Sequence, residues 1–154
     1  GADAATSRDL ALVDALEGRK PAAVEAASSL GGLAARLEFL SGSTRLTNAS
    51  ARVLDEAALE VLSALSAPGD NAVRVHVEGH TDQRPISTAR FASNWELSAA
   101  RAASIVRQLV RRGVPADRLR AVGVADREPL DRSGTPRAHA MNRRIEFEIV
   151  SAGG

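Results

Sequence analysis

Two long amphipathic helical patterns, separated by short stretches of alternating polarity, constrain the fold more than any other feature of the sequence. Between a possible cap at Asn48 or Ser50 and a stop at Ala67-Pro68-Gly69, apolar residues recur every three or four positions from Val53 to Leu65, which places them on one face of a helix. A second helical pattern begins at the capping sequence Ser-Asn-Trp-Glu (93–96) and ends at Arg-Arg-Gly (111–113), a typical helix terminus. Each helix has one apolar face to bury, so both need a further layer to pack against.

Four stretches predict strands, and their order along the chain indicates the fold class. The clearest are 73–78 and 144–149, in which apolar and polar residues alternate. Residues 37–40 and 119–124 are shorter candidates, and 135–141 predict a short helix. The order βαβαβ(α)β predicts an α+β fold: a two-layer sandwich of helices packed on one face of a small mixed sheet.

The start of the chain predicts a separate helical extension. It is rich in alanine and contains two helix-like segments, Asp9–Glu17 and a second from Pro21 to about Leu30. We therefore expect a helical extension or linker over 1–35, a globular domain over 36–150 and a tail over 151–154.

Composition excludes several classes of site. The chain has 154 residues, no cysteine and three histidines, so it predicts no disulfide, no thiolate metal site and no all-protein zinc site. No apolar run is long enough to span a membrane, and no signal-peptide pattern opens the chain. Because the sequence starts at Gly1 rather than methionine, we expect a processed fragment whose membrane anchor or export signal could lie upstream.

Charge is divided unevenly between the two halves. Residues 1–70 contain ten acidic and six basic residues, whereas residues 71–154 contain nine acidic and fourteen basic residues. The basic second half makes an anionic partner plausible. Duplex nucleic acid is one candidate, but the net charge of +1 and an aromatic content of 3% argue against it.

The densest polar cluster follows the predicted strand 73–78. The tetrapeptide Gly79-His80-Thr81-Asp82 sits in a loop at the strand end, and Arg101 lies on the helix that follows. An acid and a guanidinium held some distance apart suit a zwitterion, because the acid binds an ammonium and the planar guanidinium binds a carboxylate. On spacing alone, a structural salt bridge between Asp82 and Arg101 is the more common arrangement.

Three motifs in the same order resemble one known family. They are Gly-His-Thr-Asp at 79–82, Asn-x-x-Leu-Ser-x-x-Arg-Ala at 94–102 and Asn-Arg-Arg-Ile-Glu at 142–146. Together they resemble the OmpA-like peptidoglycan-binding domain, over roughly residues 36–150. Within it, the loop sequence resembles the periplasmic domain of flagellar motor stator B subunits, the MotB-like group. Val124-Ala125-Asp126 departs from the pattern, because many relatives have a second glycine or an aromatic residue there.

The resemblance implies non-covalent binding of peptidoglycan through the meso-diaminopimelate of its peptide stem. Asp82 would pair with the side-chain ammonium, Arg101 would bind the neighbouring carboxylate, Asn94 would bond the same groups or hold the loop, and Thr81 would help fix Asp82. For Arg143, a role in the site and a structural role are equally open. The supporting residues are His80, Ser98 and Asn142.

The resemblance also implies a setting for the domain. It indicates a wall anchor on the periplasmic face of a bacterial envelope, in a motor stator or in an outer-membrane protein or lipoprotein, and by analogy a possible homodimer. Binding of this kind would need no cofactor. Contact with a membrane would come only through segments absent from this chain.

A catalytic role is the main alternative for the same residues. His80 could form a dyad with Ser98, although no separate orienting acid or oxyanion loop is evident, and a wall hydrolase using Asp82 and His80 is the corresponding alternative function. His76 and His80 are four residues apart, which on a strand is roughly 13 Å and too far for one metal ion. The sequence therefore favours binding without catalysis or metal.

Overall fold

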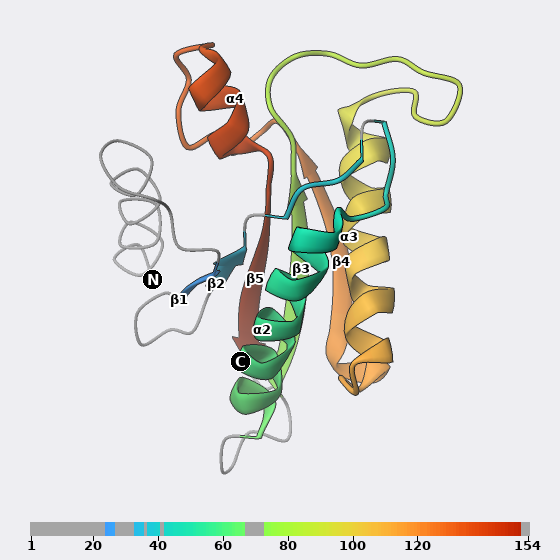
Figure 1. Cartoon of the computed structure of the whole chain (residues 1–154), viewed down its shortest axis with the longest axis vertical. Coiled ribbons are helices and arrows are strands. Elements are labelled where there is room, and N and C mark those ends of the chain that lie inside the picture. The colour runs from blue at the N-terminus through green and yellow to red at the C-terminus, as the bar shows by residue number, and fades with distance from the viewer. Residues whose placement is uncertain (1–23, 27–32, 36, 41, 67–72, 152–154) are drawn as a thin grey trace.

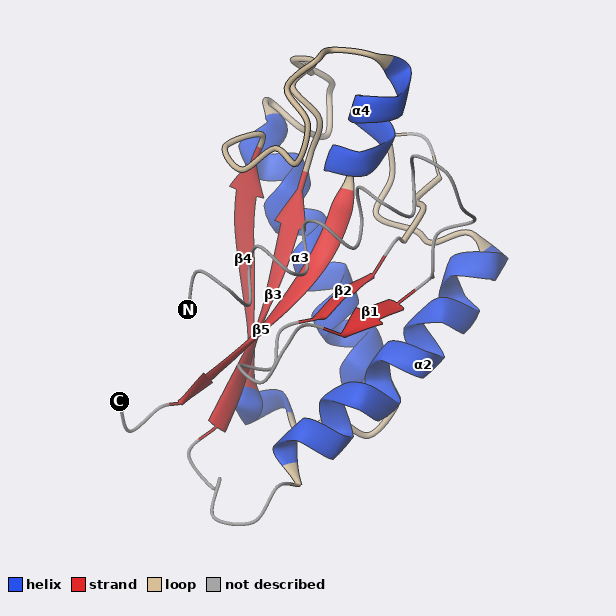
Figure 2. Ribbon diagram, turned by 90° about the vertical axis from the view of Figure 1, so that its left-hand side faces the viewer, coloured by secondary structure: helices blue, strands red, loops and turns tan. Residues whose placement is uncertain are grey.

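A mixed sheet with helices on one face forms the body of the molecule (Figures 1 and 2). The computed structural model describes residues 24–26, 33–35, 37–40, 42–66 and 73–151. The elements are β1 (Val24–Ala26), β2 (Leu33–Ala35), α2 (Asn48–Leu65), β3 (Val73–His80), α3 (Asn94–Arg111), a 3-10 turn (Ala116–Arg118), β4 (Leu119–Ala125), α4 (Pro136–Asn142) and β5 (Arg144–Ser151). The strand order is β1-β2-β5-β3-β4, with β3 parallel to β4 and the other pairs antiparallel. The predicted α+β architecture is confirmed.

The core lies between the sheet and the two long helices. The alternating valines of β3, Val75 and Val77, are fully buried, as is Phe147 of β5. Leu54 and Val61 of α2 and Ile105 and Leu109 of α3 pack in the same cluster. The predicted apolar faces of both helices therefore meet one face of the sheet. No helix among the described residues is both long and apolar enough to cross a membrane.

Helix α3 approaches the sheet so closely that two sheet positions have to be glycine. A Cβ atom at Gly79 of β3 would lie 2.4 Å from the backbone oxygen of Ser98, and one at Gly123 of β4 would lie 2.7 Å from the backbone nitrogen of Ala99. Real Cβ atoms do not approach backbone atoms so closely. The two glycines thus set the distance at which the first turns of α3 lie over the ends of β3 and β4.

Two predictions for the N-terminal region are wrong in their local structure. The helix expected from Pro21 to about Leu30 is interrupted by strand β1, and the strand expected over 37–40 is replaced by β2 at 33–35. Strand β2 pairs antiparallel with β5, and Phe39 forms only an isolated bridge to Leu46. Strand β2 pairs with the edge of β5 and β1 pairs with β2, and this pairing overrides the helical preference of the alanine-rich segment that contains β1. The helix predicted over 9–17 lies outside the described residues.

Candidate functional site

The loop that leaves β3 is held at its root by the neighbouring strand. The Thr81 backbone N–H donates to the carbonyl of Ala125 at 2.8 Å, and the Thr81 hydroxyl donates to the carbonyl of Asp82 at 3.0 Å. Ala125 has a positive φ of 56°, a conformation that favours glycine, at the position where the sequence departs from the family pattern. Thr81 and Asp82 are both buried. The backbone that carries Asp82 is therefore anchored to the end of the sheet.

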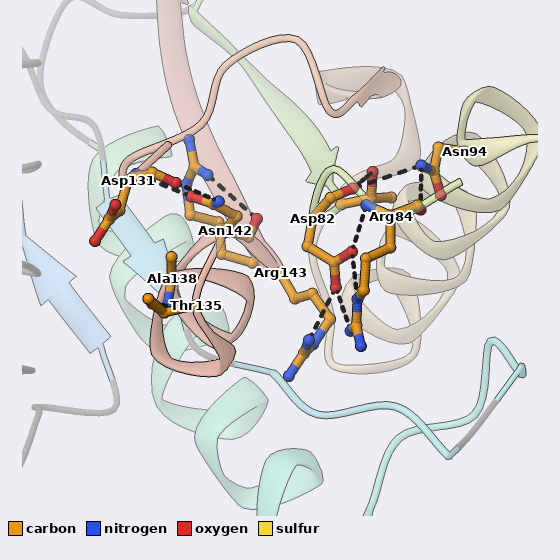
Figure 3. A network of polar contacts seen from close by, with 10 residues as sticks. Asp82, Arg84, Asn94, Asp131, Thr135, Ala138, Asn142 and Arg143 are labelled. Atoms are coloured by element: carbon orange, nitrogen blue, oxygen red, sulfur yellow. Dashed lines mark hydrogen bonds and ion pairs between the residues drawn. The ribbon is translucent and has the colours of Figure 1, made fainter. Parts of the chain in front are cut away.

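Two arginines approach the Asp82 carboxylate from different elements (Figure 3). Arg84, in the same loop, donates to Oδ1 from its backbone N–H and from Nε, both at 3.0 Å, and to Oδ2 from Nη2 at 2.6 Å. Arg143, between α4 and β5, donates from Nη1 to Oδ2 at 2.9 Å. The Asp82 side chain is 8% exposed, whereas those of Arg84 and Arg143 are 60% and 43% exposed. The acid is thus buried beneath two guanidinium groups that reach solvent.

This environment changes the pKa of Asp82. Burial alone would raise the pKa, but the hydrogen bonds from Arg84 and Arg143 outweigh burial and lower the pKa of Asp82 to about 2. The carboxylate is consequently ionised at every pH at which the protein would normally work.

The lowered pKa predicts how stability depends on pH. Because folding lowers the pKa of Asp82, its charge stabilises the folded state above the ordinary value of 3.8, and this contribution is lost as the pH falls toward about 2. After allowance for solvent screening of the exposed arginines, we expect a contribution of about 1–2 kcal/mol. The difference in unfolding free energy between the wild type and Asp82→Asn should therefore shrink by that amount from pH 6 to pH 2. A difference that stays constant would contradict the ion pairing.

Arg101 projects from the second turn of α3 and is held in place by the segment before α2. Its Nε donates to the carbonyl of Ser43 at 3.1 Å, and its guanidinium carbon lies 4.7 Å from the centre of the Phe39 ring. Burial lowers the pKa of Arg101, the nearby charge of Arg143 lowers it further, and Asp82 partly opposes both effects. A partly desolvated cation beside a second cation gains from binding an anion.

Asp82, Arg101 and Arg143 line one cavity of about 740 Å³. No ion pair or hydrogen bond joins Asp82 to Arg101 in the part of the chain that the structure describes, so the two groups are not locked together. Other charged lining residues are Glu38 and Arg84, and apolar lining comes from Leu37, Phe39, Ile86, Phe91 and Leu97. The cavity therefore presents two acids and three guanidinium groups beside an apolar wall, which suits a ligand carrying both charges on an alkyl chain.

Asn94 and Ser98 hold the backbone around the cavity. The Asn94 side-chain amide donates to the carbonyl of Arg84 at 3.0 Å and lies 3.5 Å from that of Asp82, so it fastens the loop to the start of α3. The Ser98 hydroxyl donates to the carbonyl of Trp95 at 3.1 Å and accepts from the N–H of Ala125 at 3.0 Å. Of the two roles considered for Asn94, its contacts are those of the second, holding the loop.

Asn142 has a similar task on the other side of the cavity. Its Oδ1 accepts from the N–H groups of Leu130 and Asp131, at 2.7 and 3.2 Å, and its Nδ2 donates to the carbonyl of Asp131 at 2.8 Å (Figure 3). The Thr135 hydroxyl caps α4 by accepting from the N–H of Ala138 at 3.0 Å. The Thr135 bond fixes the start of α4 and the Asn142 bonds fix its end, from which Arg143 reaches Asp82.

His80 does not line the main cavity. Together with Ser98 it lines a neighbouring crevice of about 10 Å³, which has room for about one water molecule. Its Nε2 lies 3.5 Å from a carboxylate oxygen of Glu78 and 3.9 Å from one of Glu146. The ligand atoms of these three residues lie within 4.8 Å of one another, a spacing that a metal ion could bridge. Arg144, however, donates to Glu146, and its guanidinium disfavours a second cation there.

Sequence reasoning missed Arg84 and the aromatic wall of the cavity. An aspartate in a loop often accepts a hydrogen bond from the backbone N–H two residues later, and Arg84 stands at that position after Asp82. This local pattern could have indicated a contact between the two residues. Phe39 and Phe91 come from segments far apart in the sequence, and no local pattern indicates that both line the cavity.

Sequence comparison finds relatives among bacterial proteins whose names refer to motility and to peptidoglycan binding. Motility protein B of Bacillus subtilis is 33% identical over 78 residues, which cover 50% of this chain and 30% of that protein. The peptidoglycan-binding protein ArfA of Mycobacterium tuberculosis is 37% identical over 76 residues, which cover 49% of this chain and 22% of that protein. The chain thus matches less than a third of the length of either curated relative.

A solved structure matches over nearly the whole chain. The cell wall anchor of the T6SS from Pseudomonas aeruginosa is 30% identical, with a TM-score of 0.67, and the match covers 94% of this chain and 96% of that one. The OmpA family model matches residues 38–143, which include the first two sequence motifs and the first two residues of the third. The chain therefore belongs to the OmpA family.

Proposed function

We propose that this domain binds peptidoglycan non-covalently through the meso-diaminopimelate of its peptide stem and anchors a larger envelope protein to the cell wall. The observation that carries the proposal is that Asp82 and Arg101 line one cavity without bonding each other. The free end of diaminopimelate has an ammonium and a carboxylate on one carbon. Those two groups match the acid and the guanidinium.

Each residue would have a distinct task. The ligand carboxylate would meet the terminal nitrogens of Arg101, because the Nε of this residue is used by Ser43. The ligand ammonium would bind the Asp82 carboxylate, and Arg143 would hold that carboxylate in orientation through its hydrogen bond to Oδ2. One charge-assisted hydrogen bond contributes about 1.5–3 kcal/mol, so a single stem would bind with modest affinity. Many stems on one wall would compensate through avidity.

The names of the relatives support an anchoring role. ArfA is described as peptidoglycan-binding and the Pseudomonas aeruginosa protein as a cell wall anchor, while motility protein B favours a stator-like parent. An outer-membrane protein or lipoprotein parent is the alternative. In each case the domain would work at the periplasmic face of the envelope, and a homodimer would double the number of stems bound.

The proposal includes no catalytic step. The Ser98 hydroxyl already holds Trp95 and Ala125, and the crevice that it shares with His80 has no room for a substrate. Purified domain incubated with cell walls should therefore release no soluble muropeptides. Release of muropeptides would favour the hydrolase alternative.

Titration with a stem tripeptide ending in meso-diaminopimelate tests the proposal. Backbone amide NMR shifts should change chiefly at residues 79–84 and 93–101, because these segments carry Asp82 and Arg101. Walls in which lysine replaces diaminopimelate should sediment far less protein, since the second carboxylate is missing. Shifts confined to other segments, or equal sedimentation with both walls, would contradict the assignment.

A further inference from the structure

We propose that Arg84 occupies the position on Asp82 that a ligand ammonium needs, so that the two cations compete and Arg84 sets the selectivity of the site. This inference rests on the proposed function, because it concerns the ligand ammonium at the same acid. Arg84 lies in the loop segment that resembles the stator B subunits, but the resemblance gives it no role, and the role proposed here comes from its contacts alone.

The first step is the hydrogen-bonding capacity of Asp82. A carboxylate has about four lone-pair positions. Three are taken by the backbone N–H, Nε and Nη2 of Arg84, and one by Nη1 of Arg143. An ammonium can bond to Asp82 only if one of these donors leaves.

The second step is which donor can leave. The Arg84 side chain is 60% exposed and extends from a loop. Apart from the atoms that bond Asp82, it is largely surrounded by solvent. Arg143 is less exposed and is held at the end of α4, where Asn142 fixes the backbone. If the Arg84 side chain swings into solvent, one acceptor position opens on each oxygen. The Arg84 backbone N–H and Arg143 remain and keep the carboxylate oriented.

The third step is the consequence for selectivity. An ammonium that binds Asp82 replaces the bidentate contact of the Arg84 side chain, so this exchange alone contributes little binding free energy. A ligand that also places a carboxylate on Arg101 has a second source of affinity and can complete the exchange. The competition therefore discriminates against cations without a neighbouring carboxylate, which lowers the affinity for the correct ligand but raises its selectivity.

The opposite role for Arg84 is a direct contact to the ligand carboxylate. The two roles predict opposite signs. If Arg84 competes with the ligand, its removal tightens binding; if Arg84 binds the ligand, its removal weakens binding.

The test uses Arg84→Ala with two tripeptides, one ending in meso-diaminopimelate and one ending in 2-aminopimelate, which lacks the side-chain ammonium. We expect calorimetry to show about 1.5- to 5-fold tighter binding of the first peptide by Arg84→Ala than by the wild type, the range set by exposed ion pairs. The second peptide should bind no more tightly to the variant. Arg107→Ala removes the same charge from an exposed position on α3 outside the cavity, and it should bind both peptides like the wild type.

Weaker or unchanged binding of the diaminopimelate peptide by Arg84→Ala overturns the competition while leaving the proposed function in place. Equal tightening for both peptides also overturns it, because the ammonium would then not be the competing group. If neither the wild type nor Arg84→Ala binds the diaminopimelate peptide, the proposed function fails and this inference fails with it. Binding by the variant alone would support the competition.

Discussion

Replacing Arg101 with glutamine is expected to weaken binding of the diaminopimelate tripeptide by roughly 10- to 150-fold, the range for loss of a charge-assisted hydrogen bond. Glutamine keeps much of the side-chain length but has neither the charge nor the planar pair of terminal donors. Arg101 is partly desolvated and lies near Arg143, so the negative charge of the ligand carboxylate would reduce the repulsion between the two guanidinium groups. Sedimentation with purified peptidoglycan should show the same loss.

The control for this variant has to separate binding from stability. Arg101 also contacts Phe39 and the carbonyl of Ser43, so its replacement will cost some stability. Arg107→Gln, on the exposed side of the same helix, removes the same charge and should bind like the wild type. Chemical unfolding of both variants shows whether the fold is retained. If Arg101→Gln and Asp82→Asn both fold and both sediment with peptidoglycan like the wild type, the site is wrongly assigned.

Gly79→Ala is expected to give the largest loss of stability, about 3 kcal/mol or more, because overpacking against fixed backbone exceeds the usual cost of an extra methyl group. The new Cβ would lie 2.4 Å from the backbone oxygen of Ser98. Neither β3, paired on both sides, nor the first turns of α3 can move away without breaking hydrogen bonds. The strand end and the helix would separate, and with them the elements that carry Asp82 and Arg101.

A second glycine distinguishes this clash from the general cost of replacing glycine. Gly113 ends α3 with a φ of 97°, and a Cβ there would meet nothing within 4 Å. Gly113→Ala should therefore cost only backbone strain, about 1–2 kcal/mol. Unfolding free energies from urea titration compare the two variants. An equal cost for both would show that the close approach of α3 does not determine the packing.

Local patterns in the sequence were sufficient for the elements that build the core. The 3-4 repeats of α2 and α3 and the alternation in β3 and β5 reflect the burial of one face of each element, and this burial is a local property of the sequence. The N-terminal strands were mispredicted because β2 depends on pairing with β5, more than 100 residues away, and β1 depends on pairing with β2. Alanine-rich segments carry no sign of such pairing, and their intrinsic preference is helical.

The site was predictable in its residue types but not in its pairings. The strand-end position of Asp82 and the helical position of Arg101 follow from local structure, and both residues line the cavity. That Asp82 is bonded by Arg84 and Arg143 depends on how a loop and the end of α4 meet in space. A sequence pattern does not indicate which of several nearby arginines will form the ion pair with a given acid.

The most direct test of the account compares two proteins and two ligands in one calorimetric cycle. The proteins are the wild type and Arg101→Gln; the ligands are stem tripeptides ending in meso-diaminopimelate and in lysine, which keeps the ammonium and lacks the carboxylate. The account predicts that Arg101→Gln loses at least 10-fold in affinity for the first ligand, and that both proteins bind the lysine peptide equally weakly. An equal loss for both peptides would mean that Arg101 does not contact the ligand carboxylate, and it would contradict the account.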